Sequence, residues 1–440
     1  MALSGHINIF CSSFRSRLFV ERLPSSLGSQ IRCALRAFFF FMLISVGANA
    51  QIVNGSVYSY FGIGPLQGRA SAYNRALGYT GVGVRDDYNI SAVNPAAYNA
   101  IVKPFTAMFE LGASYESIKH QSIDASSSSR SGGLNGINFL FKLSSKWGIA
   151  LGASPLSTIN YKASSTRTFG TLSPTGISYE GSGGINQYYF GTSFEVFKNF
   201  SLGANGSYYL GTVKKIENVD ATAVTSQLVV ANRATAHNAG GDVGAQYSFL
   251  LKKKTRITLG ATWDPGTYLS GTQQTSIVNP NLDTLKKTDR ISTRYRMPPT
   301  YGGGIGIRSG RSTLAADFHW INWKNAIVND GQTYQDSRKY SAGYEYRGDL
   351  TAIKYLNAIS FRAGGFVQDY PLVLKNTPFT TWGYTLGISL PLDGYRASIN
   401  INYAFTQLGT TKAGLIRENS NRLVLDFVIR DIWGVKRKLD

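Results

Sequence analysis

The feature that most constrains this chain is a regular alternation of apolar and polar residues in short segments. In the stretch FTAMFELGASYES, residues 105–117, Phe105, Phe109 and Leu111 occupy odd positions, whereas Glu110 and Ser114 occupy even ones. Because successive side chains of a β-strand point to opposite faces, one face of this strand suits lipid and the other suits water. No apolar run after residue 50 approaches the ~18 residues of a membrane-spanning helix. This pattern is typical of a transmembrane β-barrel.

The alternation recurs often enough to predict fourteen strands. An even number lets the last strand pair with the first in an antiparallel ring, which removes the sheet edges. The predicted fold class is therefore an all-β membrane protein, a 14-stranded antiparallel transmembrane β-barrel. Its segments are 105–115, 137–141, 147–151, 188–194, 200–210, 243–249, 257–263, 291–297, 314–320, 340–346, 359–363, 382–388, 397–405 and 423–429.

The charged residues of these segments test the barrel hypothesis independently. Charged residues make up only 16% of the chain, against about a quarter in a soluble domain. A cation facing lipid at mid-membrane costs roughly 2–4 kcal/mol, so charges should fall on the polar parity. The charges found on that parity are Glu110, Glu116, Lys142, Glu195, Asp242, Arg294, Arg296, Asp317, Glu345, Arg362 and Asp426.

The N-terminal 50 residues have the pattern of a secretory signal peptide. An apolar run of eleven residues, Ala37–Gly47, follows Arg32 and Arg36 and precedes the small residues at 48–50. Such a run is too short to span a membrane as a helix. Both cysteines, Cys11 and Cys33, lie in this segment, so no disulfide or thiolate metal site is expected in the mature chain. A secreted chain with these features is expected to be integral to the outer membrane of a Gram-negative cell.

The connections between the strands predict which end of the barrel faces outward. Short turns at 144–146, 198–199, 252–255, 309–311 and 391–395 suit the periplasmic side, and long polar connections suit the cell exterior. The long segments lie near 160–181, 216–234, 266–288, 326–337, 368–378 and 407–417. Residues 105–433 are thus predicted to form the barrel, and residues 434–440 form a basic periplasmic tail.

Residues 51–104 precede the first strand and have neither strand nor helix periodicity. A fourteen-stranded barrel is wider than its own side chains can fill. Irregular backbone is tolerated at membrane depth where it lines a polar interior, so we expect this segment to lie in the lumen as a plug. Gly78 and its neighbouring glycines permit tight turns, Pro95 fixes the chain direction, and Asn94 is suited to an Asx-type turn.

With a signal peptide, a lumenal insert that ends in the triplet Asn94-Pro95-Ala96 and fourteen strands, the chain resembles the FadL-type outer-membrane transporters of long-chain fatty acids and other hydrophobic compounds. The stretches Met297–Ser309, Ser312–Trp323 and Lys339–Gly348 are also similar to that family. The resemblance implies that the insert is a hatch that blocks a straight aqueous path. It also implies that a hydrophobic ligand binds in the lumen and leaves sideways through a gap in the wall, with Asn94, Pro95 and Ala96 coupling the hatch to the wall.

Four arginines are candidate lumenal ligands for a substrate carboxylate. Arg294, Arg296, Arg362 and Arg396 are predicted to point inward, where they could form charge-assisted hydrogen bonds to a fatty acid. The alternative is that they pair with lumenal acids or with acids of the hatch, because barrel interiors are polar as a rule.

The sequence does not indicate an enzyme, a metal site or a cofactor. No nucleophile motif and no metal-ligand spacing is present, and the few histidines are not paired with a serine in a recognisable motif. The net charge of +20 does not indicate nucleic-acid binding, because a barrel lacks an element that reads a groove. Many cations lie in the short turns, where they could contact outer-membrane lipid headgroups or an acidic periplasmic partner.

Two functions follow from this organisation. The first is an outer-membrane channel for the uptake of hydrophobic small molecules such as long-chain fatty acids, with lateral release past the hatch. The alternative is a structural barrel subunit of an outer-membrane secretion or assembly machine, with a protein partner in the membrane or the periplasm. A transporter requires an apolar lumenal pocket and a break in the wall, whereas a subunit requires a surface for its partner.

Overall fold

The computed structural model describes residues 55–168, 174–220, 227–251, 254–279, 284–326, 331–392 and 396–432. The predicted signal peptide and the predicted basic tail lie outside these residues. None of the helices in the described ranges is long and apolar enough to cross a membrane.

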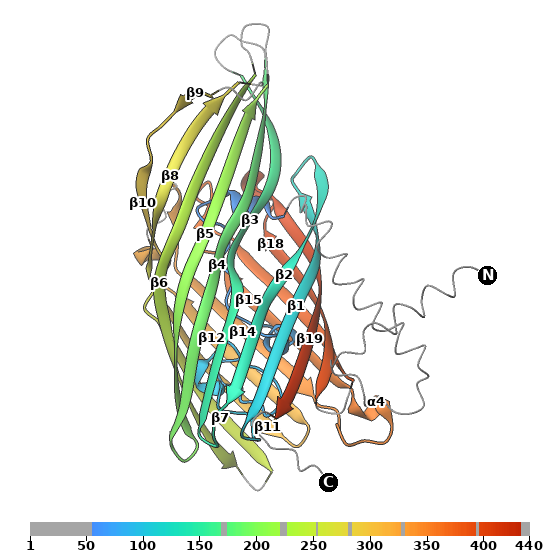
Figure 1. Ribbon diagram of the computed structural model, residues 1–440. Coiled ribbons are helices and arrows are strands. Elements are labelled where there is room, and N and C mark those ends of the chain that lie inside the picture. Colours follow the sequence, from blue (N-terminus) through green and yellow to red (C-terminus); the bar gives the residue numbers. More distant parts are fainter. Residues whose placement is uncertain are drawn as a thin grey trace, which may run out of the picture. The chain divides into compact units, whose positions relative to one another are not determined.

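Fourteen antiparallel strands form a closed ring (Figure 1), as predicted. The last strand closes on the first through a ladder that runs from Thr106 opposite Ile432 to Gln121 opposite Arg417. The strands of the ring are, in order, β1 (Thr106–Gln121), β2 (Ser126–Lys142), β3 (Trp147–Arg167), β4 (Thr175–Phe197), β5 (Phe200–Val219), β6 (Leu228–Leu251), β7 (Thr255–Asp264), β11 (Thr300–Ser309), β12 (Ser312–Ile321), β14 (Ser337–Tyr346), β15 (Ser360–Asp369), β17 (Thr380–Pro391), β18 (Ala397–Gly409) and β19 (Arg417–Ile432).

The predicted eighth strand, 291–297, is wrong as a member of the ring. Residues Ile291–Arg296 form β10, which pairs with β8 (Tyr268–Val278), and β8 pairs with the outer part of β6. The ring instead continues from β7 to β11, which starts at Thr300. The sequence GGGIG at 302–306 has few side chains, so no alternation is visible in it and the strand was missed. Three small strands complete the set: β9 (Thr284–Lys287) pairs with β8, and β13 (Thr333–Tyr334) pairs with β16 (Leu372–Val373).

Strands β3 to β6 are about twice as long as a bilayer requires. They contain 20 to 24 residues each, whereas roughly 10 tilted residues span the membrane. Figure 1 shows these strands and β8 rising beyond the other strands at one end of the barrel. Much of the polar sequence predicted as long loops at 160–181, 216–234 and 266–288 is therefore strand. Its polarity has a physical reason, because a sheet that extends past the bilayer meets water on its outer face.

The two faces of the wall differ as the alternation predicted. Apolar side chains such as Phe190, Leu314 and Leu386 are exposed on the outside of the ring. Carboxylates and other polar groups are buried on the inside, among them Glu110, Asp242, Asp317, Glu345 and Asp426. This arrangement confirms the assignment of parity for these strands.

Residues 55–101 lie inside the ring, where their side chains contact strands on opposite sides of it. We call this segment the hatch. It contains three short helices, η1 (Val57–Tyr60), α3 (Ala72–Ala76) and η2 (Pro95–Ala97). Tyr98 and Ile90 of the hatch pack with Met108, Leu140 and Tyr189 of the wall in a buried apolar cluster. Outside the hatch, the short helices are η3 (Trp323–Asn325), α4 (Tyr355–Ala358) and η4 (Lys412–Gly414).

Candidate functional site

The triplet Asn94-Pro95-Ala96 is the point where the hatch is joined to β6 and β7. Asn94 is fully buried, and its Oδ1 accepts a hydrogen bond from the backbone N–H of Ala96 at 3.0 Å, which is the Asx-type bond predicted from the sequence. Its Nδ2 donates to the backbone oxygens of Val82 (2.9 Å), Ala245 (3.2 Å) and Ala261 (3.3 Å). One side chain thus connects two parts of the hatch to two neighbouring strands of the wall.

Arg85 supports this junction from within the hatch. Its guanidinium donates to Asn99 Oδ1 at 2.6 Å, to the Ala96 carbonyl at 3.2 Å and to Gln246 Oε1 of β6 at 3.4 Å. Burial lowers the pKa of Arg85 to about 10, so the group stays charged at neutral pH. The Gln246 amide in turn donates to the Val82 carbonyl at 2.9 Å. The turn that holds Val82 is therefore bonded to the wall from two directions.

Ion pairs link the hatch to distant strands of the wall. Arg69 pairs with Asp242 of β6 at 2.6 Å, and Arg75 pairs with Asp426 of β19. On the other side, Asp86 accepts from Arg308 of β11 at 3.1 Å and from Arg347, which follows β14. Because Asp86, Asp242 and Asp426 are buried, each of these carboxylates depends on its arginine for compensation of its charge.

The hatch and the wall also approach each other backbone to backbone. A Cβ atom added at Gly260 of β7 would overlap the carbonyl oxygen of Val82. Only a residue without a side chain permits this distance. The same condition applies at Gly203, Gly244, Gly304 and Gly364, whose added Cβ atoms would overlap hatch atoms or lie within 3 Å of them. Glycines on several strands therefore line the inner face of the wall where the hatch packs.

The structure brings only one of the four predicted arginines into this network. Arg362 is buried, pairs with Glu345 at 3.0 Å and stacks over the Tyr73 ring of the hatch at 4.8 Å. That contact agrees with the alternative in which a lumenal arginine pairs with a lumenal acid.

The other three arginines are not directed as predicted. Arg294 and Arg296 lie on β10, outside the ring, where both guanidinium groups stack on the ring of Tyr268 of β8, and Arg296 also lines a cavity beside the hatch. Their parity was assigned for a ring strand, and β10 lies outside the ring. Arg396 is exposed in the β17–β18 turn, since β18 begins only at the next residue. A role of these residues in binding a substrate stays a prediction.

Sequence reasoning missed the residues that hold the hatch. Arg69, Arg75 and Arg85 lie in a segment without periodicity, so no parity rule applied to them. Asp317 of β12 was correctly predicted to face the lumen, but its contact with the hatch was not predicted. Its carboxylate accepts hydrogen bonds from the backbone N–H groups of Gly81 (2.6 Å) and Val82 (2.9 Å). The sequence offered one signal for these contacts. Charged residues in a segment inside a polar barrel are expected to form ion pairs with charged residues of the wall, but the pattern does not say which residues pair.

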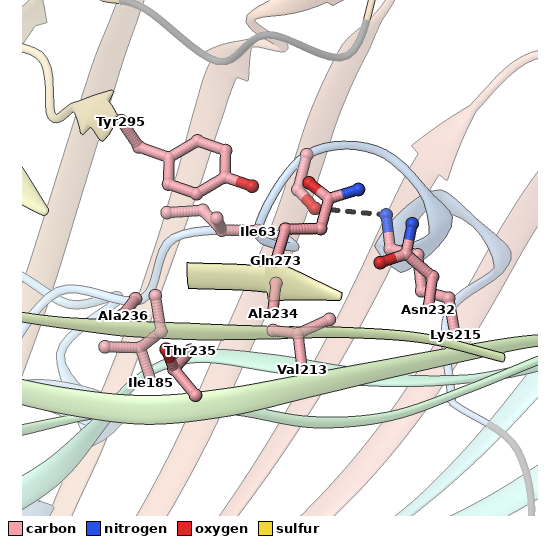
Figure 2. Close-up of a pocket in the computed structure, with 11 residues that line it drawn as sticks. Ile63, Ile185, Val213, Lys215, Asn232, Ala234, Thr235, Ala236, Gln273 and Tyr295 are labelled. Carbon is pink, nitrogen blue, oxygen red and sulfur yellow. Dashed lines mark hydrogen bonds between the residues drawn. The ribbon is translucent and has the colours of Figure 1, made fainter. Parts of the chain in front are cut away.

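Two small cavities lie beside the hatch, the first against the extended strands and the second against β10 and the connections that follow β12 and β15. The first has a volume of about 190 Å³, and Figure 2 shows Ile63 of the hatch facing Tyr295 of β10 and Ile185 of β4 across it. At its polar end, Lys215 donates to the Gly62 carbonyl at 3.2 Å. The second cavity, of about 110 Å³, also contacts Ile63 and Tyr295. Its other lining residues are largely aromatic or apolar and include Tyr58, Phe61, Trp323, Tyr334 and Tyr370.

The wall has a seam between β2 and β3. These strands pair only from Ile137–Lys142 to Gly148–Ala153, although both continue well beyond this ladder. Register shifts fall close to the point of separation, at Gly112/Ala113 in the β1–β2 ladder and at Pro155/Ser157 in the β3–β4 ladder. Above that point the hatch bonds to the edge of β3, where Gln67 donates to Leu156 and Gly55 donates to Asn160, each at 2.7 Å. The hatch thus covers the edge of β3 at the seam.

Replacing Asn94 with alanine is expected to loosen the hatch at β6 and β7. The change leaves buried backbone groups of Val82 and Ala96 with fewer partners, which costs about 1–3 kcal/mol. Asn94→Asp is the matched variant, because it keeps the bond to the Ala96 N–H but loses every bond donated by Nδ2. Chemical unfolding and limited proteolysis of the hatch in detergent measure the effect. Equal stability of wild type and Asn94→Ala would contradict this role.

Comparison with solved structures shows the same fold in outer-membrane transporters. The toluene transporter TbuX of Ralstonia pickettii is 16% identical, with a TM-score of 0.56 over 83% of this chain and 99% of that chain. A FadL homologue of Pseudomonas aeruginosa is 13% identical, with a TM-score of 0.55 over 84% of this chain and all of its own. The toluene transporter TodX of P. putida is 17% identical, with a TM-score of 0.51 over 84% and 100%. The predicted resemblance to the FadL type is therefore confirmed for the fold.

Comparison with curated proteins gives no match. The family model BamG, in contrast, matches residues 33–440, which is most of the chain. The ring, its apolar outer face and the shared fold identify an integral outer-membrane protein. The chain belongs to the BamG family and has the fold of the FadL-type outer-membrane channels.

Proposed function

We propose that this protein is a plugged-barrel subunit of the outer-membrane barrel-assembly (BAM) machinery, in which the barrel acts as a scaffold. The family name associates its members with that machinery. The observation that carries the proposal is the fixed hatch. A scaffold can keep its lumen plugged, and this hatch is held to the wall by buried ion pairs, by Asn94 and by backbone packing against glycines.

The energetic cost of moving the hatch favours a permanent plug. Moving the hatch away would break the pairs of Arg69, Arg75 and Asp86 together, and it would also break the bonds of Asn94 to β6 and β7. Because these contacts hold the hatch to several strands of the wall, a complete exit of the hatch would have to break all of them in each transport cycle.

Uptake of small hydrophobic molecules is the second candidate, and the seam between β2 and β3 favours it. A lateral route beside the hatch does not require the hatch to leave the lumen. The larger cavity, of about 190 Å³, is lined by both apolar and polar residues and has room for a ligand of small size, since a cavity of ~150 Å³ holds benzene. Sites for larger ligands occupy about 300–1,000 Å³, so the closed state does not accommodate a long-chain fatty acid.

Extraction of the native protein in a mild detergent distinguishes the two candidates. We expect the tagged protein to elute with stoichiometric subunits of the barrel-assembly machinery, identified by mass spectrometry, and without a retained apolar ligand. A matched preparation of another outer-membrane barrel from the same cells controls for carry-over. A lone barrel that carries a small hydrophobic compound would contradict the scaffold and support transport.

A further inference from the structure

One periplasmic connection is much longer than the others. The turns after β2, β4, β6, β11 and β17 contain two to five residues, whereas residues 347–359 between β14 and β15 form a connection of thirteen. This connection includes the short helix α4. Figure 1 shows α4 at the end of the barrel where β7 and β11 are labelled. We call residues 347–359 the α4 loop. Neither strand nor turn signals mark it in the sequence.

The α4 loop has a fixed conformation. The Asp349 carboxylate accepts from the Thr351 backbone N–H at 3.0 Å and from the Thr351 hydroxyl at 2.6 Å. The Asp349 N–H donates to the Asn357 carbonyl at 2.7 Å, which closes the loop at its base. Arg311 of the neighbouring turn pairs with Asp349 at 2.5 Å. These bonds hold the tip of the loop in one position relative to the barrel end.

The tip presents apolar side chains to the surroundings. Ile353 is 103% exposed, Leu356 is 77% exposed and Tyr355 is 53% exposed. Exposed apolar residues that are fixed and clustered mark interaction sites more often than isolated ones do. Three side chains are far too few for a stable interface of 1,200–2,000 Å². A group of three such side chains is instead suited to fill a pocket on a partner protein at the centre of a larger interface.

The barrel end that carries this tip is basic. Lys354 lies between the apolar residues, Arg396 is exposed in the neighbouring β17–β18 turn, and Lys146, Lys198 and Lys254 are exposed in turns elsewhere on the same barrel end. Asp349 does not offset them, because it is paired with Arg311. A partner that covers this end is therefore expected to carry acidic residues around an apolar pocket.

We infer that the α4 loop is the anchor by which this barrel binds a periplasmic subunit of the assembly machinery, inserting Ile353 and Leu356 into an apolar pocket with an acidic rim. The inference rests on the proposed function and names the surface that it requires. A folded protein fits the tip better than the membrane does. Helices that bind in the membrane interface expose a long apolar face, and α4 has only four residues. Moreover, the fourteen strands already hold the chain in the bilayer.

The test compares full-length tagged variants after extraction from native membranes. We expect Ile353→Ser combined with Leu356→Ser to reduce the amount of co-purified assembly subunits, per barrel, by at least about tenfold. Lys354→Glu is expected to reduce it several-fold, and added salt should weaken wild-type binding because exposed charges are screened. The matched control is Leu250→Ser combined with Leu251→Ser, which removes two exposed leucines at the end of β6 and should retain the subunits.

Each outcome decides the inference. If wild type and the Ile353/Leu356 variant retain the same subunits, the α4 loop is not the anchor and the proposed function stands. If wild type retains none, both fail. Tyr355→Trp in the isolated barrel tests the membrane directly, since quenching by brominated lipids would place the tip in lipid and overturn the inference. Heat-modifiability on gels shows folding of each barrel, and Ile353→Asp alone replaces the double variant if that variant misfolds.

Discussion

Asp426→Ala is expected to destabilise the folded barrel by about 3 kcal/mol, at the lower end for a broken buried ion pair, because the buried Arg75 loses its nearest counter-ion and keeps only Glu110 at 3.9 Å. Asp426 of β19 is the ion-pair partner of Arg75 of the hatch and also accepts from the Asn402 amide at 3.1 Å. Urea unfolding in detergent measures the loss, and trypsin cleavage after Arg75 reports whether the hatch has become accessible.

The matched control is Asp349→Ala, which removes the carboxylate of an exposed ion pair with Arg311. An exposed pair contributes about 0–1 kcal/mol, so this variant should unfold close to wild type. A double variant, Arg75→Met with Asp426→Leu, should recover part of the loss, because both charges of this pair are removed and Glu110, the second partner of Arg75, keeps its hydrogen bonds from the Ala72 N–H and the Asn138 amide. Equal effects of Asp426→Ala and Asp349→Ala would show that the hatch does not depend on its buried ion pairs.

Gly260→Val is expected to displace the hatch from β7 and to cost about 3 kcal/mol, at the upper end for overpacked sites. The new side chain would overlap the Val82 carbonyl, which is held by Asn94 and Gln246 and cannot move without losing both bonds. Valine is otherwise favourable in a strand, so a loss of stability would come from the contact and not from the strand itself. Limited proteolysis and urea unfolding measure both effects.

Gly303→Val is the control for this substitution. It lies on the adjacent strand, β11, and an added Cβ has no atom within 4 Å. This variant should be as stable as wild type or slightly more stable, because valine favours the strand conformation and its side chain meets no neighbouring atom at this position. If Gly260→Val is as stable as Gly303→Val, the hatch is loosely packed and the permanent plug loses its main support.

The candidate site was predictable only in outline. Asn94 was singled out by its place before the first strand, and the structure bonds it to the wall. Arg294 and Arg296 were placed in the lumen because 291–297 alternates, yet a strand outside the ring alternates equally well. The seam was implied by the family resemblance alone, and its position between β2 and β3 came from the strand pairing.

The sequence by itself determined the barrel and the face of the wall that meets lipid, whereas the count of fourteen strands was right only because β10 was counted in place of β11. These properties follow from a period of two along the chain, which each segment carries independently of the others. The tertiary structure alone decided how the hatch is held and what the periplasmic end presents. Arg75 and Asp426 are separated by 351 positions, and Asp86 and Arg347 by 261. Contacts at such separations depend on ring closure and on the path of an aperiodic segment, and neither has a local signal in the sequence.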